Sequence, residues 1–278
     1  MKLPTLLLLL LLPYVLTAQS RLTGQIFDGS KNTPLAYVNI GVLGAGIGTV
    51  SDSDGSFSFS VPSRLNQETV KLSMLGYESK TFGVAEFRQL MRSEGKVVLK
   101  PKQYDLEQIV VVPDFTKTKV IGNPARRMKR VDGFDGDKLG REGGIIIKLK
   151  RRFQPAKVIK FQLYIAYSTY DQLKFRLNFY SVKNNVPFKP LAQENVIITT
   201  DLKEGILEVD LEQYDIVVQD DFAVTLEWIE DFGDGRLRFP FRRYGPRCVF
   251  RNASQDRWES YSGLLAPSPA LNVTIGYN

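Results

Sequence analysis

The stretch Gly48-Thr49-Val50-Ser51-Asp52-Ser53-Asp54-Gly55-Ser56-Phe57-Ser58-Phe59 indicates the fold class of the first part of this chain. Its two phenylalanines alternate with serines, and an apolar residue at every second position is typical of a strand with one buried face. Asp54-Gly55 precedes this strand, and glycine readily adopts the positive φ that a hairpin turn requires. The alternative is half of a calcium loop beginning at Asp52, but Ser63 stands where such a loop needs a glutamate. We therefore predict a turn between two strands.

The same alternation recurs on both sides of that stretch. Residues 38–42 and 70–74 carry an apolar side chain at every second position, and turn residues such as Asp28-Gly29 separate the runs. Strands at about ten-residue spacing predict an antiparallel β-sandwich. We expect this sandwich to occupy residues 19–100, with one short helix of two turns over Val84–Arg92.

Several segments of this region carry a family resemblance. They are Gly24-Gln25-Ile26-Phe27-Asp28, Pro34-Leu35-Ala36-Tyr37-Val38-Asn39-Ile40, Gly48–Phe57 and Ser73-Met74-Leu75-Gly76-Tyr77-Glu78. In this order they resemble the carboxypeptidase-regulatory-like domain, a seven-stranded, transthyretin-like sandwich. The resemblance implies an accessory module of Bacteroidota-type envelope proteins, including TonB-dependent outer-membrane transporters, and Leu106–Val112 looks like the segment that often follows it there. It does not imply peptidase activity, because in peptidases this domain accompanies a separate zinc-containing catalytic domain.

The first 18 residues read as a signal peptide. Lys2 supplies a positive charge, Leu6–Leu12 is an unbroken leucine run, and Leu16-Thr17-Ala18 has the small residue expected before a cleavage site. The apolar run of about 14 residues is short for a bilayer core of roughly 30 Å, although an uncleaved anchor is the alternative. No cysteine follows the run, which argues against a lipoprotein anchor there. We expect an exported protein, periplasmic or associated with the outer membrane, with no transmembrane segment in its mature chain.

Strand patterns return from residue 144 onward. The expected inward-facing sets are Phe161, Leu163, Ile165 and Tyr167, then Phe175, Leu177 and Phe179, then Phe222, Val224, Leu226 and Trp228, and finally Val273, Ile275 and Tyr277. At least six strands without a convincing helix predict a second, larger β-sandwich over residues 144–278. The fold class of the whole chain is therefore all-β.

Residues 101–143 read as a linker that contains proline and glycine and is rich in basic residues. Within it, Asp132–Asp137 has an acidic spacing that suits a turn-rich loop, with calcium binding as the alternative. Residues 117–160 hold fourteen Lys or Arg and four Asp or Glu, a net +10 within a chain whose formal charge is +7.

This charge defines a candidate anion-contact patch. Its members are Arg126, Arg127, Lys129, Arg130, Lys148, Lys150, Arg151 and Arg152. In an exported protein such a patch favours an envelope protein, an anionic glycan or a lipid headgroup as partner, and not nucleic acid. The alternative is a solvated linker whose charge keeps the two sandwiches apart.

The chain contains no histidine, which removes the commonest general base and the commonest ligand of catalytic zinc. Its single cysteine, Cys248, lies in a strand-like context and is expected to be buried and inert. We predict no catalytic residues, no metal site and no cofactor. Carboxylate chemistry, as in a glycosidase, or a Ser-Lys arrangement is left as the hydrolase alternative, although no pattern singles out either one.

We therefore interpret the chain as a non-catalytic interaction or scaffold protein of the cell envelope. The first alternative is a glycan- or polyanion-binding module. It is motivated by the basic patch and by aromatic residues in turn-rich sequence, namely Tyr244, Trp258 and Tyr261. Aromatic faces of this kind can stack on sugar rings, although in a β-sandwich most such residues belong to the core.

Overall fold

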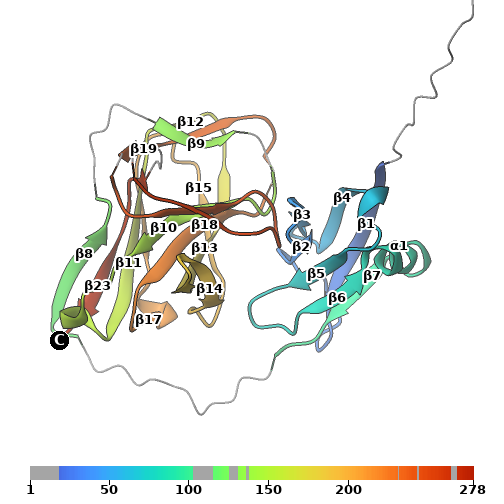
Figure 1. The fold of residues 1–278 in the computed structure, drawn as a ribbon, viewed down its shortest axis with the longest axis horizontal. Helices are drawn as coiled ribbons and strands as arrows, with labels where there is room; N and C mark the ends of the chain where they lie inside the picture. The colour runs from blue at the N-terminus through green and yellow to red at the C-terminus, as the bar shows by residue number, and fades with distance from the viewer. Residues whose placement is uncertain are drawn as a thin grey trace, which may run out of the picture.

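The computed structural model describes residues 19–102, 115–124, 131–135, 138–230, 232–242, 244–263 and 268–278. The predicted signal peptide lies outside the described residues. The described chain forms two units that lie side by side, each with its own hydrophobic core (Figure 1). The structure confirms the all-β prediction, since α1 is the one α-helix among the described residues.

The first unit contains seven strands and one helix. They are β1 (Gln19–Asp28), β2 (Asn39–Val42), β3 (Ile47–Val50), β4 (Ser56–Pro62), β5 (Thr69–Ser73), β6 (Lys80–Gly83), α1 (Val84–Ser93) and β7 (Lys96–Leu99), with a 3-10 turn at Ser63–Leu65. The strands form one sheet in the order β4-β1-β7 and another in the order β3-β2-β5-β6. The helix predicted at Val84–Arg92 is confirmed as α1.

Alternating apolar side chains build the core of this unit, as the pattern predicts. Phe57 and Phe59 of β4 point inward together with Ile26 of β1 and Ile40 of β2. Helix α1 contributes Phe87, which is fully buried. The predicted turn before β4 is also confirmed, because Gly55 has φ +77° and its N–H donates to the carbonyl of Asp52 at 3.0 Å.

The second unit contains the remaining strands. They are β8 (Lys117–Gly122), β9 (Val131–Asp135), β10 (Glu142–Ile147), β11 (Ala156–Ile165), β12 (Tyr167–Ser168), β13 (Leu173–Lys183), β14 (Val186–Pro190), β15 (Val196–Thr200), β16 (Gly205–Asp210), β17 (Val217–Val218), β18 (Phe222–Trp228), β19 (Arg236–Arg242), β20 (Cys248–Arg251), β21 (Glu259–Tyr261), β22 (Ser268–Pro269) and β23 (Leu271–Tyr277). Two 3-10 turns, Arg151–Phe153 and Glu212–Tyr214, connect some of them.

Two large sheets of this unit share one core. The seven-stranded sheet runs β14-β13-β18-β10-β20-β21 with β15 beside β13, and the five-stranded sheet runs β16-β11-β23-β8 with β17 beside β11. A smaller sheet joins β12, β19 and β22, and β9 pairs with β19. The inward sets predicted in β13 and β18 are buried between the two large sheets.

A register shift explains the burial pattern of β11. Between Val158 and Lys160 the pairing with β23 slips by one residue, as in a β-bulge. Val158 therefore faces the core before the shift, and Phe161 and Leu163 face it after the shift. The sequence prediction placed Tyr167 on the same inward face, and this is wrong. The strand ends at Ile165, and Tyr167 is 39% exposed in the separate strand β12.

The linker predicted over residues 101–143 also differs from the structure. Strand β8 pairs with β23 along its whole length, β9 pairs with β19, and β10 begins at Glu142. Part of the basic composition that suggested a linker belongs to an edge strand, because Lys117 and Lys119 of β8 are exposed at the border of the five-stranded sheet. Residues 103–114, 125–130 and 136–137 of the predicted linker lie outside the described residues. Charged side chains of this kind discourage a sheet edge from pairing with other chains. The predicted loop Asp132–Asp137 likewise begins within strand β9.

The two units are docked through a loop of the second one, residues 252–257. The hydroxyl of Ser254 donates to Oδ1 of Asn39 at 2.9 Å, and the N–H of Gly44 donates to the carbonyl of Gln255 at 3.0 Å. Ser254 is fully buried. In Figure 1 this contact lies on the side of β2 and β3, whereas α1 lies on the side of the first unit away from the second.

Tyr37 makes a second group of contacts between the units. Its carbonyl accepts a hydrogen bond from Arg176, and its hydroxyl donates to Oε2 of Glu230 at 2.9 Å. Lys174 forms an ion pair with Glu230 and donates to the Tyr37 hydroxyl at 3.0 Å. The two units are therefore held by buried and half-buried polar contacts, which fix the space between them.

No helix among the described residues is long and apolar enough to cross a membrane.

Candidate functional site: a cleft between the two units

A row of four charged side chains crosses the outer face of the seven-stranded sheet. In the strand register, Arg176 of β13 lies opposite Glu227 of β18, Glu227 lies opposite Glu142 of β10, and Glu142 lies opposite Arg251 of β20. Successive residues of a strand point to opposite faces. Because Phe175 and its partners face the core, these four residues face the first unit.

Each glutamate of this row is paired with an arginine. Arg176 Nη1 lies 3.1 Å from Glu227 Oε2, and Arg251 Nη2 lies 2.7 Å from Glu142 Oε2 and 3.4 Å from Glu227 Oε1. Asn178 also donates to both glutamates, at 2.9 Å and 3.3 Å. Both glutamates are fully buried, so their charges are balanced inside the protein and not by solvent.

Further hydroxyl groups complete the surroundings of Glu142. Its Oε1 accepts hydrogen bonds from the hydroxyl of Thr225 and, at 3.1 Å, from that of Tyr180. Burial, together with the negative charge of Glu142, raises the pKa of Tyr180 well above its ordinary value. Tyr180 therefore remains a neutral hydrogen-bond donor at physiological pH.

Burial and charge act in opposite directions on the ionisation of this row. Burial raises the pKa of Glu227, and the positive charge of Arg176 works against that rise. Burial alone would lower the pKa of Arg251, but the negative charges of Glu142 and Glu227 raise it above its ordinary value. Arg251 therefore stays charged beside the two glutamates.

Above this row, a cleft of 640 Å³ lies between the two units. Both units contribute to its walls, and basic side chains are prominent among them: Lys71, Lys102, Arg176, Lys189 and Arg251. None of the described residues that line it is acidic. Since Arg176 and Arg251 are balanced by buried glutamates, the lysines, Lys71 and Lys189 among them, give the cleft its positive charge.

Aromatic and amide side chains share these walls. The aromatic residues are Tyr77, Tyr180, Phe188 and Trp258, and the amides are Asn39, Asn178, Gln193, Asn195 and Gln255. The guanidinium of Arg251 lies 5.1 Å from the ring centre of Trp258, and Tyr180 meets the same ring edge-on at 5.9 Å. Phe188 is 53% exposed, and the ammonium groups of Lys183 and Lys189 lie 5.0 Å and 5.6 Å from its ring centre.

Tyr77 is fixed in the cleft wall by Asp28. The Tyr77 hydroxyl donates to Oδ2 of Asp28 at 2.8 Å, and Oδ1 of Asp28 accepts from the hydroxyl and the N–H of Ser30, both at 2.7 Å. The hydroxyl of Ser30, then its N–H and the Tyr77 hydroxyl, hold the pKa of Asp28 well below its usual range. Burial, and then Asp28, raise the pKa of Tyr77 to about 12.

This arrangement predicts a loss of stability in acid. A carboxyl whose pKa is lowered on folding stabilises the protein above its unfolded pKa, about 3.9 for aspartate, and this contribution is lost as the pH falls below that value. Between pH 7 and pH 3, the free energy of unfolding measured with urea should therefore fall more for the wild type than for Asp28→Asn. The decrease for Tyr77→Phe, which removes one hydrogen-bond donor to Asp28, should lie between those of the wild type and Asp28→Asn. Equal pH dependence of all three proteins would contradict this assignment.

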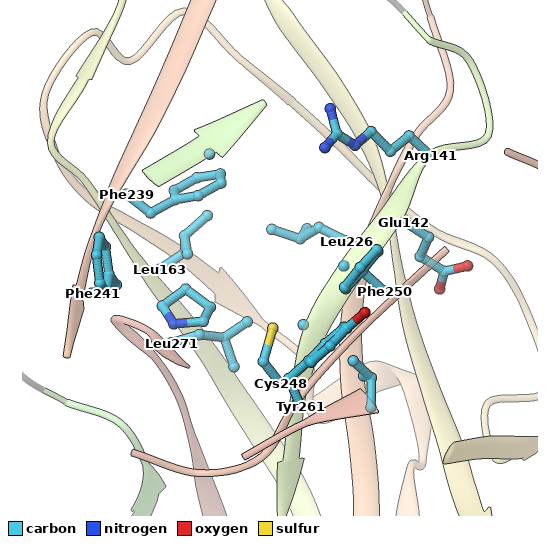
Figure 2. Close-up of a pocket in the computed structure, with 15 residues that line it drawn as sticks. Arg141, Glu142, Leu163, Leu226, Phe239, Phe241, Cys248, Phe250, Tyr261 and Leu271 are labelled. Atoms are coloured by element: carbon cyan, nitrogen blue, oxygen red, sulfur yellow. The ribbon is translucent and has the colours of Figure 1, made fainter. Parts of the chain in front are cut away.

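A second hollow lies between the sheets of the second unit. It has a volume of 270 Å³, and Figure 2 shows Leu163, Leu226 and Phe239 around it, whereas the carboxylate of Glu142 points away. Cys248 also lines it and is half-buried, whereas the sequence analysis expected a buried thiol. Figure 2 shows that the sulfur of Cys248 points toward this hollow. Its mainly apolar lining suits an apolar group and not a charged ligand.

The structure describes half of the predicted anion-contact patch. Lys148, Lys150, Arg151 and Arg152 are all exposed on the connection between β10 and β11. Lys148 lies 3.9 Å from Asp221, and the Lys148 side chain is largely open to solvent whereas that of Asp221 is partly covered. Arg126, Arg127, Lys129 and Arg130 lie outside the described residues.

The three aromatic residues considered for sugar binding lie in different places. Trp258 lines the cleft between the units, Tyr261 lines the hollow of Figure 2, and Tyr244 is 68% exposed and lines neither cavity. The sequence interpretation thus identified one residue of the cleft. It missed Arg176, Glu142 and Glu227, although charged residues inside otherwise apolar strands, such as Glu227 within Phe222–Trp228, are a signal that could have pointed to them.

Comparisons with known proteins identify the first unit. Residues 22–111 match the family model of the CarboxypepD_reg-like domain, and the chain therefore carries such a domain. No curated protein matches the sequence. Among solved structures, the VP2 subviral particle of infectious bursal disease virus is similar over 95% of this chain, with 7% identity and a TM-score of 0.28. This chain spans 61% of that viral chain, and a similarity of this size carries no argument about function.

Proposed function

We propose that this protein is an exported, non-catalytic interaction protein of the cell envelope, in which a CarboxypepD_reg-like domain and a second β-sandwich act together as a scaffold. The observation that carries the proposal is the docking of loop 252–257 against β2 and β3. Two sandwiches fixed in this way present one continuous surface to a partner. Export is supported by the signal-like sequence at residues 1–18.

Other features agree with this proposal. The seven strands β1–β7, arranged in two sheets, support the transthyretin-like sandwich predicted for the first unit. Glu142 and Glu227 are fully buried and ion-paired with arginines, which supports a structural role over acid–base catalysis. A partner in the envelope of a Bacteroidota-type bacterium is part of the proposal.

The test is retention of a partner by the mature protein, residues 19–278, from envelope extract of the source bacterium. We expect specific retention by the wild type and weaker retention by a variant whose two units are undocked. The experiment is run at about 50 mM and about 500 mM salt, between which the Debye length falls from about 14 Å to about 4 Å. Loss of the partner at high salt would indicate that it binds exposed basic residues such as Lys148 and Arg152. Retention of the partner at both salt concentrations would indicate that it binds an apolar face or a sheet edge.

Two results would overturn the scaffold role. One is the absence of any specifically retained protein at either salt concentration. The other is a hydrolytic turnover by the purified protein that Glu142→Gln or Glu227→Gln abolishes while the fold persists by circular dichroism. That result would support the hydrolase alternative.

A second candidate function is the binding of anionic glycans or other polyanions. The lining of the cleft favours it, because basic and aromatic side chains meet there without an acidic neighbour among the described lining residues.

A further inference from the structure

We infer that the cleft between the two units is a binding site for an acidic saccharide, a short sugar chain that carries carboxylate groups. This inference names the ligand of the second candidate function, and it is independent of the scaffold role. The volume of the cleft, 640 Å³, lies within the range of about 300–1,000 Å³ that is usual for sites of small ligands. Such sites often lie at domain interfaces.

The first argument is the two buried arginines. Arg176 is 3% exposed and Arg251 is 9% exposed, both line the cleft, and their Nε atoms are buried without a hydrogen-bond partner among the described residues. A buried donor without a partner is costly, so such atoms point to a missing acceptor. A guanidinium is a good donor to carboxylate oxygens because its geometry matches theirs.

The second argument is that these arginines are already held in position. Glu227 fixes Nη1 of Arg176, and Glu142 fixes Nη2 of Arg251, from the sheet below. A ligand therefore meets groups that lose little conformational freedom on binding. Since the glutamates neutralise these two arginines, the attraction for an anion over a longer distance comes from Lys71 and Lys189.

The third argument is the combination of aromatic faces with amides, which selects a sugar over a simple anion. The ring of Phe188 is 53% exposed, and Trp258 lies across the cleft wall beside Arg251. Flat aromatic rings pack against the C–H face of a sugar, and amide side chains such as Asn195 exchange hydrogen bonds with its hydroxyls. Oδ1 of Asn195 is buried and has no hydrogen-bond partner among the described residues, so it can accept one from a hydroxyl.

Binding is measured by calorimetry on the mature two-unit protein with a trisaccharide of uronic acids. A neutral trisaccharide of the same length, inorganic phosphate and a triglutamate peptide serve as comparison ligands. We expect the acidic trisaccharide to bind at least about tenfold more tightly than each of the other three. Tryptophan fluorescence gives a second readout, because Trp258 lines the cleft whereas Trp228 is buried in the core, and the change on binding should disappear in Trp258→Phe.

Two sets of variants locate the site. Phe188→Ala should weaken binding of the acidic trisaccharide by about tenfold, and Lys71→Gln combined with Lys189→Gln should weaken it and reduce its dependence on salt. Each has a matched control outside the cleft: Tyr244→Ala for the exposed aromatic residue, and Lys148→Gln for the exposed lysine. Both controls should bind within about twofold of the wild type. Urea denaturation checks that all variants remain folded.

Several results would overturn the inference. They are equal binding of the neutral trisaccharide, binding of phosphate or triglutamate as tight as that of the acidic sugar, and unchanged affinity in folded Phe188→Ala and in the folded double lysine variant. Absence of binding by the wild type would overturn it too. None of these results bears on the retention of an envelope protein, so failure of this site and failure of the scaffold role are distinguishable.

Discussion

Replacement of Arg176 by methionine is expected to lower the free energy of unfolding by about 3–5 kcal/mol, the usual cost of removing one partner of a buried ion pair. Methionine keeps most of the side-chain volume, so the loss reports mainly on charge and hydrogen bonding. Glu227, fully buried, would then keep only the more distant Arg251 at 3.4 Å as a cationic partner within the row. The contact of Arg176 with the carbonyl of Tyr37 would be lost as well. Urea denaturation at pH 7 measures the change.

A double-mutant cycle separates the ion pair from the rest of the site. If Arg176 and Glu227 stabilise one another, Arg176→Met combined with Glu227→Gln should lose at least about 1 kcal/mol less than the sum of the two single losses. The control is Lys148→Met, which removes a surface ion pair at 3.9 Å and should change the stability by less than about 0.5 kcal/mol. A loss below about 1 kcal/mol in Arg176→Met would show that the row contributes little to stability.

Substitution of Gly41 by alanine is expected to separate the two units. A Cβ at Gly41 would lie 2.1 Å from the carbonyl oxygen of Ser254, which belongs to the docking loop, and backbone atoms cannot move aside cheaply. Overpacking of this kind typically costs about 1–3 kcal/mol. Release of loop 252–257 relieves it, and each unit retains its own core. We expect a larger radius of gyration in small-angle scattering and two unfolding transitions instead of one.

Gly83→Ala is the matched control for this experiment. Gly83 has φ −61°, and the nearest atom to its added Cβ is Cβ of Glu86 at 4.0 Å, so alanine fits there without a clash. This variant should keep the scattering profile of the wild type. If Gly41→Ala also keeps that profile and unfolds in one step, the docking contact is not what holds the units together.

In the second unit, the alternation of apolar and polar residues predicted some buried strand faces correctly and others wrongly. Period-two patterns located the inward faces of β13 and β18 correctly, because the hydrophobic effect requires one apolar face wherever two sheets meet. The same reasoning failed at Tyr167, since no local sequence pattern indicates that the chain leaves one sheet after Ile165 and enters another. It also failed at β8, where an exposed edge strand with lysines has the composition of a linker.

The candidate site is a product of strand register. Arg176, Glu227, Glu142 and Arg251 are separated by up to 109 positions in the chain, yet pairing of β13, β18, β10 and β20 sets them in one row. A shift of one residue in any of these pairings would turn a charge toward the core. The sequence shows a charged residue in each strand, but it does not show which residues lie opposite one another.

The sequence by itself determined the all-β class and the turn at Gly55, because these depend on local spacing and on the backbone freedom of glycine. Its resemblance to the carboxypeptidase-regulatory-like domain, expected over residues 19–100, is supported by the family match at residues 22–111. Only the tertiary structure decided that two sandwiches dock through Ser254 and that a basic, aromatic-lined cleft lies between them. The physical reason is that docking and register depend on contacts between residues far apart in the chain. Such contacts are selected by burial and charge pairing in three dimensions and leave no periodic signal in the sequence.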